Sequence, residues 1–163
     1  MPRLLNRPVS TQYTRCGSPP HLTGCRRTAS EPLACSPSVA SYLIVANRTL
    51  GGAALLEEVR RRANTGPATL YVVVPGYPDR PAAAARLAAA LAAFRAMGAE
   101  AEGEVGDPHP VAAVHDALQG RSVDEIILST LPAGLSRWID NDTPSKLRRL
   151  FGLPVVHLIS EET

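Results

Sequence analysis

No cysteine follows Cys35 in this 163-residue sequence, and no apolar run is long enough to span a membrane. The three cysteines, which all lie near the amino terminus, match no zinc-binding spacing. The rest of the chain therefore forms no disulfide and suits a reducing compartment. A helical membrane span needs ~18 consecutive apolar residues, and a secretory signal needs a shorter apolar core. We expect a cytoplasmic protein with no membrane partner.

The sequence also has little excess charge, with a formal net charge of +2. Residues 1–41 carry five arginines and one acid, a charge of +4, which leaves −2 for residues 42–163. Nucleic-acid-binding domains present a strongly basic surface. The nearly neutral remainder of this chain therefore argues against a nucleic-acid partner.

Residues 1–41 form a segment of distinct composition, with six prolines, six serines and no hydrophobic periodicity. Such a segment buries too little apolar surface to offset the entropy of ordering it, so we predict a disordered tail. Its basic, acid-poor composition also resembles a transit peptide, although the scattered prolines interrupt an amphipathic helix. A targeting role and a tail without a role both remain open.

Residues 42–163 alternate short apolar segments with amphipathic ones, as in an α/β domain. We predict strands over 42–46, 69–74, 99–105, 125–130 and 153–159. We predict helices over 52–65, 81–97, 108–119 and 143–151. This alternation indicates right-handed crossovers and a parallel sheet with helices on both faces. Glutamates alternate with small residues over 99–105, which is typical of an edge strand.

Polar residues follow two of the predicted strands, where open α/β sheets bind ligands. Asn47, Arg48 and Thr49 follow the first strand, and Ser129 and Thr130 end the fourth. Asn47 could bind a base or sugar and Arg48 a phosphate, or Asn47 could shape a turn and Thr49 begin a helix. The two hydroxyls could contact a ligand or the loop backbone. No base can be placed beside Ser129, so we do not predict a nucleophile.

The remaining polar positions favour structural roles. His109 and His115 are six residues apart and form no metal-binding pair, so no metal is expected. Asp107 favours a helix cap over a catalytic carboxylate, with Pro108 as the first helical residue. His157 interrupts an apolar strand and suggests a boundary or an interface. Trp138 could pack in the core or stack on a base.

Two helical patterns give further expectations. Arg60, Arg61 and Arg62 are predicted to form a solvated helix face. Leu147, Leu150 and Phe151 are predicted to face inward from the last helix, and Leu135, Trp138 and Ile139 to form one amphipathic turn.

Several segments together resemble a universal stress protein domain. They are Gly106-Asp107-Pro108 before a helix, Asp124 to Ser129, Ala133-Gly134-Leu135 and Leu153-Pro154-Val155-Val156. The resemblance covers about residues 42–159. It implies a five-stranded parallel sheet in the order 3-2-1-4-5, with a switch point between strands one and four. The candidate cofactor-binding residues at that crevice are Asn47, Arg48, Thr49, Gly106, Ser129, Thr130 and Gly134.

The nucleotide-binding pattern of that family is not complete in this sequence. Its three glycines and following hydroxyl residue fall on Leu128, Leu131, Asn141 and Asp142. Backbone approaches a phosphate closely only where no side chain intervenes. Asp140 and Asp142 also place negative charge beside the expected phosphates. The resemblance therefore implies a degenerate site at which ATP or AMP binds weakly or not at all.

Two functions remain open at this stage. The first is a non-catalytic universal-stress-like regulatory or interaction protein, acting in the stress response. The second is a small domain that binds or hydrolyses ATP or AMP through a non-standard loop. The missing glycines favour the first.

Residues 155–159 are apolar and β-branched, and a free edge of this kind needs covering. With the family resemblance, this predicts a homodimer through that strand.

Overall fold

The computed structural model describes residues 39–76, 79–136, 138 and 142–160. The predicted tail lies almost entirely outside these residues. The strands are β1 (Ala40–Val45), β2 (Ala68–Pro75), β3 (Glu100–Gly106), β4 (Glu125–Thr130) and β5 (Val155–Ile159). The helices are α1 (Ala53–Thr65), α2 (Arg80–Ala96), α3 (Pro110–Leu118) and α5 (Thr143–Phe151). Each corresponds to a predicted element, with ends displaced by at most two residues.

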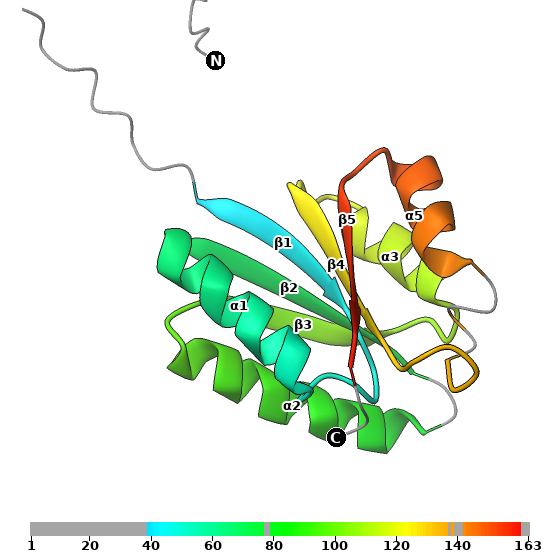
Figure 1. The fold of residues 1–163 in the computed structure, drawn as a ribbon, viewed down its shortest axis with the longest axis horizontal. Helices are drawn as coiled ribbons and strands as arrows, with labels where there is room; N and C mark the ends of the chain where they lie inside the picture. Colours follow the sequence, from blue (N-terminus) through cyan, green and yellow to red (C-terminus); the bar gives the residue numbers. More distant parts are fainter. Residues whose placement is uncertain (1–38, 77–78, 137, 139–141, 161–163) are drawn as a thin grey trace, which may run out of the picture. The chain divides into compact units, whose positions relative to one another are not determined.

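All five strands are parallel and lie in the order β3-β2-β1-β4-β5, which confirms the predicted fold (Figure 1). Ile44 of β1 lies opposite Val72 of β2 and Ile127 of β4. The chain therefore leaves β1 toward β2 and returns on the other side as β4. This reversal of strand order places a switch point at the carboxyl ends of β1 and β4, where open sheets form a crevice.

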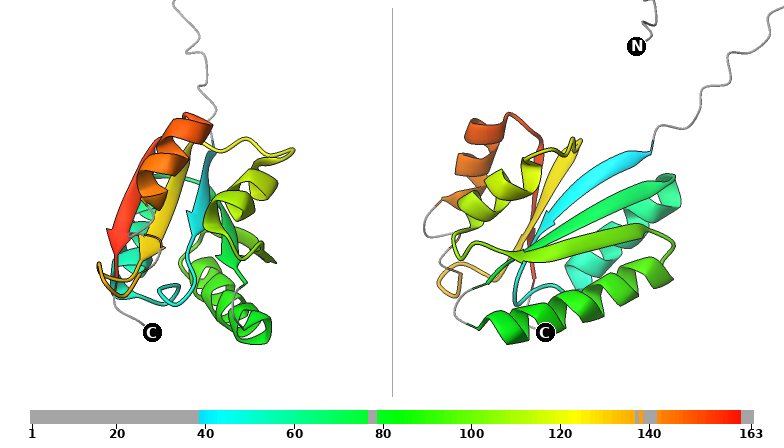
Figure 2. Two further views of the ribbon diagram at one scale, coloured as in Figure 1. Left: turned by 90° about the vertical axis from the view of Figure 1, so that its right-hand side faces the viewer. Right: turned by 180° about the vertical axis from the view of Figure 1, so that it is seen from behind.

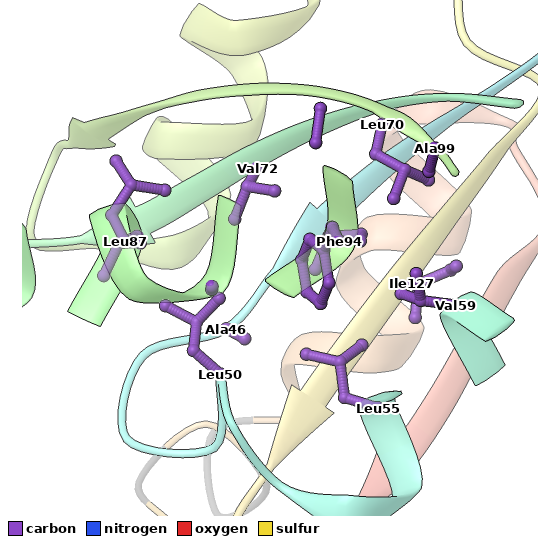
Figure 3. Close-up of a cluster of buried hydrophobic side chains, with 14 of the residues drawn as sticks. Ala46, Leu50, Leu55, Val59, Leu70, Val72, Leu87, Phe94, Ala99 and Ile127 are labelled. Atoms are coloured by element: carbon purple, nitrogen blue, oxygen red, sulfur yellow. The ribbon is translucent and has the colours of Figure 1, made fainter. Parts of the chain in front are cut away.

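The helices cover both faces of the sheet, with α1 and α2 on one face and α3 and α5 on the other (Figures 1 and 2). Ile127 of β4 packs with Phe94 of α2 in the first core (Figure 3), to which Ile44 of β1 also belongs. Leu43 and Leu128 pack with Leu147 of α5 in the second. Because strand side chains alternate between faces, two covered faces require continuous apolar strands.

Two details of the predicted helices are wrong. Asp107 does not cap α3, because His109 is the N-cap residue and Pro110 occupies the first turn. The Asp107 carboxylate instead accepts from the backbone N–H of His109 at 2.7 Å, which closes a turn before the helix. Leu150 is 61% exposed rather than inward. The buried residues of α5 are Thr143 and Leu147, whereas Leu150 lies on the same helix face but in the last turn, where it is exposed.

The amino end of the sheet holds a cluster of charged side chains. Arg62 of α1 binds Glu125 of β4 at 2.5 Å and Glu58 at 2.8 Å, and it lies 4.8 Å from the centre of the Tyr42 ring. Burial lowers the pKa of Arg62, but hydrogen bonds to Tyr42, Glu58 and Glu125 outweigh it and raise that pKa overall. The predicted solvated face is therefore correct for Arg60 and Arg61, whereas Arg62 fastens α1 to β1 and β4.

Candidate functional site

A cavity of about 660 Å³ lies at the carboxyl ends of β1 and β4. This volume is within the range of small-molecule sites. Five predicted site residues line it together, and the other lining residues come from the end of β2, the segment before and at the start of α3, and the segment after β4. The lining residues are Asn47, Arg48, Thr49, Pro75, Pro108, His109, Pro110, Ser129, Thr130, Leu131, Leu135, Ser136 and Trp138.

Asn47 follows β1 and uses both ends of its side-chain amide inside the protein. Its Nδ2 donates to the Pro75 carbonyl at 2.7 Å, and its Oδ1 accepts from the Arg86 guanidinium of α2 at 2.8 Å. These contacts support the turn-shaping alternative. Sequence reasoning missed Arg86, although it lies three residues after buried Ala83 and four before buried Ala90, on the inner side of α2.

Thr49 and Ser129 join the loop after β1 to the end of β4. The Thr49 hydroxyl donates to the Ser129 carbonyl at 3.0 Å, and Thr49 is only 2% exposed. The buried Ser129 hydroxyl lies 3.5 Å from the Ser160 hydroxyl, at the long limit of a hydrogen bond. Gly52 packs against Ser160, since a Cβ on Gly52 would lie 2.8 Å from the Ser160 Cβ. These hydroxyls therefore hold the floor of the crevice together.

Thr130 connects the cavity to β5. Its Oγ1 lies 2.8 Å from His157 Nε2, a contact that sequence reasoning missed because the two residues are 27 positions apart. Leu128 is the register partner of His157, so Thr130, two residues further along β4, points to the same face. Burial, together with the positive charge of Arg148, lowers the pKa of His157. The imidazole is therefore predominantly neutral at neutral pH.

The described residues that line the cavity include neither Gly106 nor Gly134, the other two candidates. Gly106 is the last residue of β3 and packs closely against β2 and α3, since a Cβ there would lie 3.0 Å from Val73 and 3.2 Å from Ala113. Gly134 has φ of +85° in the turn that follows β4. A left-handed backbone favours glycine, so this residue shapes the loop. A direct ligand contact from either glycine stays a prediction.

Apolar side chains also line the cavity. Leu135 is 71% exposed, and it lines the cavity together with half-buried Trp138, its partner in the predicted amphipathic turn. Ile139, the third member of the predicted turn, lies outside the described residues. His109 also lines the cavity, with its Nδ1 3.2 Å from the Asp107 carboxylate. In the described part of the chain, no three His, Cys, Asp or Glu side chains gather as metal ligands.

Comparisons with known proteins identify the fold of this chain through similar structures. No protein-family model and no curated protein sequence matches the chain. A universal stress protein from Archaeoglobus fulgidus has a similar structure, with a TM-score of 0.51 and 17% identity. The match covers 72% of this chain and 92% of that one. This chain has the universal stress protein fold. A second universal stress protein structure, in complex with cAMP, matches with a TM-score of 0.45 and 18% identity, covering 76% of this chain and 98% of that one.

The positions at which the family resemblance implies phosphate-binding glycines lie in β4 and in the segment that follows it. Leu128 is fully buried within β4, and the Leu131 side chain lines the cavity. Asp142 adopts a left-handed backbone, with φ of 51°, at the start of α5. Asn141 lies outside the described residues.

No helix in the described ranges is both long and apolar enough to cross a membrane.

Proposed function

We propose that this domain is a universal-stress-like regulatory or interaction protein, acting in the stress response, with a degenerate nucleotide site and no catalytic activity. The observation that carries the proposal is the cavity at the β1/β4 switch point, whose polar residues hydrogen-bond mainly within the protein. Asn47 and Thr49 use their side chains to fix the crevice. A site built in this way is preformed but offers few groups to a phosphate chain.

The lining of the cavity supports weak binding of ATP. Leu131 occupies the wall at a position where the family resemblance places a phosphate-binding glycine. Among the described lining residues, Arg48 is the only arginine or lysine. A triphosphate carries several negative charges, and its binding needs either more cations or close backbone amides. A smaller ligand with an apolar or aromatic portion fits this lining better.

A nucleotide-hydrolysing domain is the second candidate, and the contact between Thr130 and His157 favours it. A hydroxyl beside a neutral imidazole is the arrangement that activates a nucleophile. The charged neighbour of His157 is, however, the cation Arg148, not a carboxylate. An orienting carboxylate stabilises the imidazolium that forms during such catalysis. This observation favours the non-catalytic proposal.

Thermal unfolding with ATP, AMP or cyclic AMP tests the proposal, because a ligand that binds only the folded state raises the melting temperature. At about 1 mM ligand, we expect ATP to raise it by less than about 2 °C. AMP or cyclic AMP should raise it more. We expect no phosphate release from ATP or AMP. A rise of more than about 5 °C with ATP, or sustained phosphate release, would support the second candidate instead.

We also propose a homodimer through β5, which forms one edge of the sheet. The edge bears Ile159, 57% exposed, and half-buried Val156, whereas β3 at the opposite edge carries exposed glutamates. A two-fold contact uses the same patch on both subunits, so β5 would pair antiparallel with its copy. Sedimentation of the wild type should give a dimer, and V156K should give a monomer. E102K, on the opposite edge, is the control and should remain dimeric.

A further inference from the structure

The Thr130 hydroxyl stands between the cavity and the imidazole of His157. Thr130 lines the cavity, and its Oγ1 lies 2.8 Å from His157 Nε2. One of the two atoms donates to the other, and the tautomer and charge of the ring decide which. A neutral ring can accept at Nε2, and the Thr130 oxygen lone pairs are then available to the cavity.

Protonation of His157 fixes the direction of its hydrogen bond with Thr130. Both ring nitrogens of an imidazolium are donors, so Nε2–H must donate to the Thr130 oxygen. The Thr130 hydrogen must then point elsewhere, and the cavity is the side that Thr130 lines. Protonating His157 therefore gives the cavity a hydroxyl donor and adds a positive charge to the wall behind it. Both changes favour a negatively charged ligand.

We propose that Thr130 is a ligand-contacting residue of the crevice and that His157 is its positioning residue, so that the site binds anionic ligands more tightly as pH falls. This inference rests on the proposed function, since it assumes that the cavity is a ligand site. It adds the chemical class of the preferred ligand, an anion, and the condition that strengthens its binding.

The groups around His157 agree with this direction. Arg148 of α5 acts on the imidazole with its positive charge, and its guanidinium donates to the Val155 carbonyl of β5 at 3.0 Å. The neighbouring strand β4 presents the uncharged Thr130. The helix α1 approaches the other side of the β5 end, where Gly52 meets Ser160. An anion in the cavity would offset the repulsion between Arg148 and a protonated His157, and so would raise the pKa of that histidine.

Trp138 supplies the signal for a direct test, because it lines the cavity and is the only tryptophan in the chain. Cyclic AMP is a suitable anionic probe, since its phosphodiester keeps its single negative charge over the pH range in which a histidine titrates. Adenosine has the same base and sugar without the phosphate. The full-length protein is titrated with each probe at about pH 7.5 and about pH 5, on either side of the ordinary histidine value.

We expect cyclic AMP to bind about fivefold more tightly at the lower pH, and adenosine to change by less than about twofold. H157Q keeps a donor for Thr130 but cannot be charged, so it should abolish the pH dependence. T130V should weaken cyclic AMP binding at both pH values. H109Q replaces the other histidine that lines the cavity and should retain the pH dependence.

The remaining outcomes overturn the inference in distinguishable ways. Equal affinity for cyclic AMP at the two pH values, or an unchanged pH dependence in H157Q, contradicts the inference alone. Loss of the pH dependence in H109Q transfers the effect to that histidine and also contradicts it. Absence of binding for both probes at both pH values contradicts the proposed function, and this inference with it.

Discussion

The two ends of the sheet are held together by different interactions, ion pairs at the amino ends of the strands and neutral hydrogen bonds at the carboxyl ends. At the amino end, Arg62 is held by Glu125 and Glu58, with all three side chains less than one-fifth exposed. At the carboxyl end, the loop after β1 is joined to β4 by a neutral hydrogen bond from Thr49 to the Ser129 carbonyl. Both arrangements connect elements that are far apart in the sequence.

The difference separates stability from binding. Removing one partner of a sheltered ion pair is strongly destabilising because it leaves the other charge unpaired, whereas the charges of the intact pair neutralise each other and offer little to a ligand. The hydrogen bond from Thr49 to Ser129 joins two uncharged residues that themselves line the cavity. Substitutions at the amino end should therefore change stability alone, whereas substitutions at the carboxyl end should change stability less and binding more.

The largest effect is expected for R62A at the amino end. It removes two ion pairs and the contact with the Tyr42 ring, and it leaves two sheltered carboxylates without their cation. We expect a loss of about 2 kcal/mol in the free energy of unfolding, measured by chemical denaturation. R60A is the matched control, since Arg60 pairs with Glu57 on the surface, and should cost less than about 0.5 kcal/mol. An equal loss in R62A and R60A would contradict the claim that the sheltered Arg62 contributes more to stability than the exposed Arg60.

A smaller loss of stability is expected for T49V at the carboxyl end. Valine keeps the shape but leaves the Ser129 carbonyl without the hydroxyl donor, at a cost of about 1 kcal/mol. Because this bond fixes the crevice, ligand affinity should fall as well. T65V removes a hydroxyl from the exposed surface of α1 and is the control. If T49V lost stability but bound ligands normally, the two ends would not differ in function.

The smallest effect concerns the acid sensitivity of folding. The pKa of His157 is lowered in the folded protein, first by burial and then by Arg148. The neutral ring therefore contributes stability above the unfolded pKa of about 6.5, and this contribution is lost as pH falls through the lower folded value. H157Q should lose less melting temperature than the wild type between about pH 7.5 and pH 5. H115Q, at an exposed position on α3, should behave like the wild type.

Much of the fold could be predicted from the sequence because the core is patterned locally. The alternation of short apolar and amphipathic segments indicated a parallel sheet covered on both faces, and the alternating glutamates of β3 indicated an edge. The start of α3 could not be predicted as well. Two prolines flank His109, and either could have opened the helix.

The candidate site could be predicted only in part. The ends of the predicted strands indicated Asn47 and Thr130, because the carboxyl ends of parallel strands lie at the same end of the sheet. The partners of those residues, Arg86 and His157, depend on how distant elements pack. No local pattern links residue 47 to residue 86, so whether Asn47 meets a ligand or the protein could not be decided from the sequence.

The proposed degenerate nucleotide site is tested most directly by calorimetric titration with ATP. The wild type should show a dissociation constant of about 1 mM or weaker, because Leu131 lines the cavity at a position where the family resemblance implies a glycine. Replacing Leu131 and Asn141 with glycine and Asp142 with serine should tighten binding by about tenfold or more. A wild-type dissociation constant near 1 μM, or a triple variant that binds no better, would contradict this account.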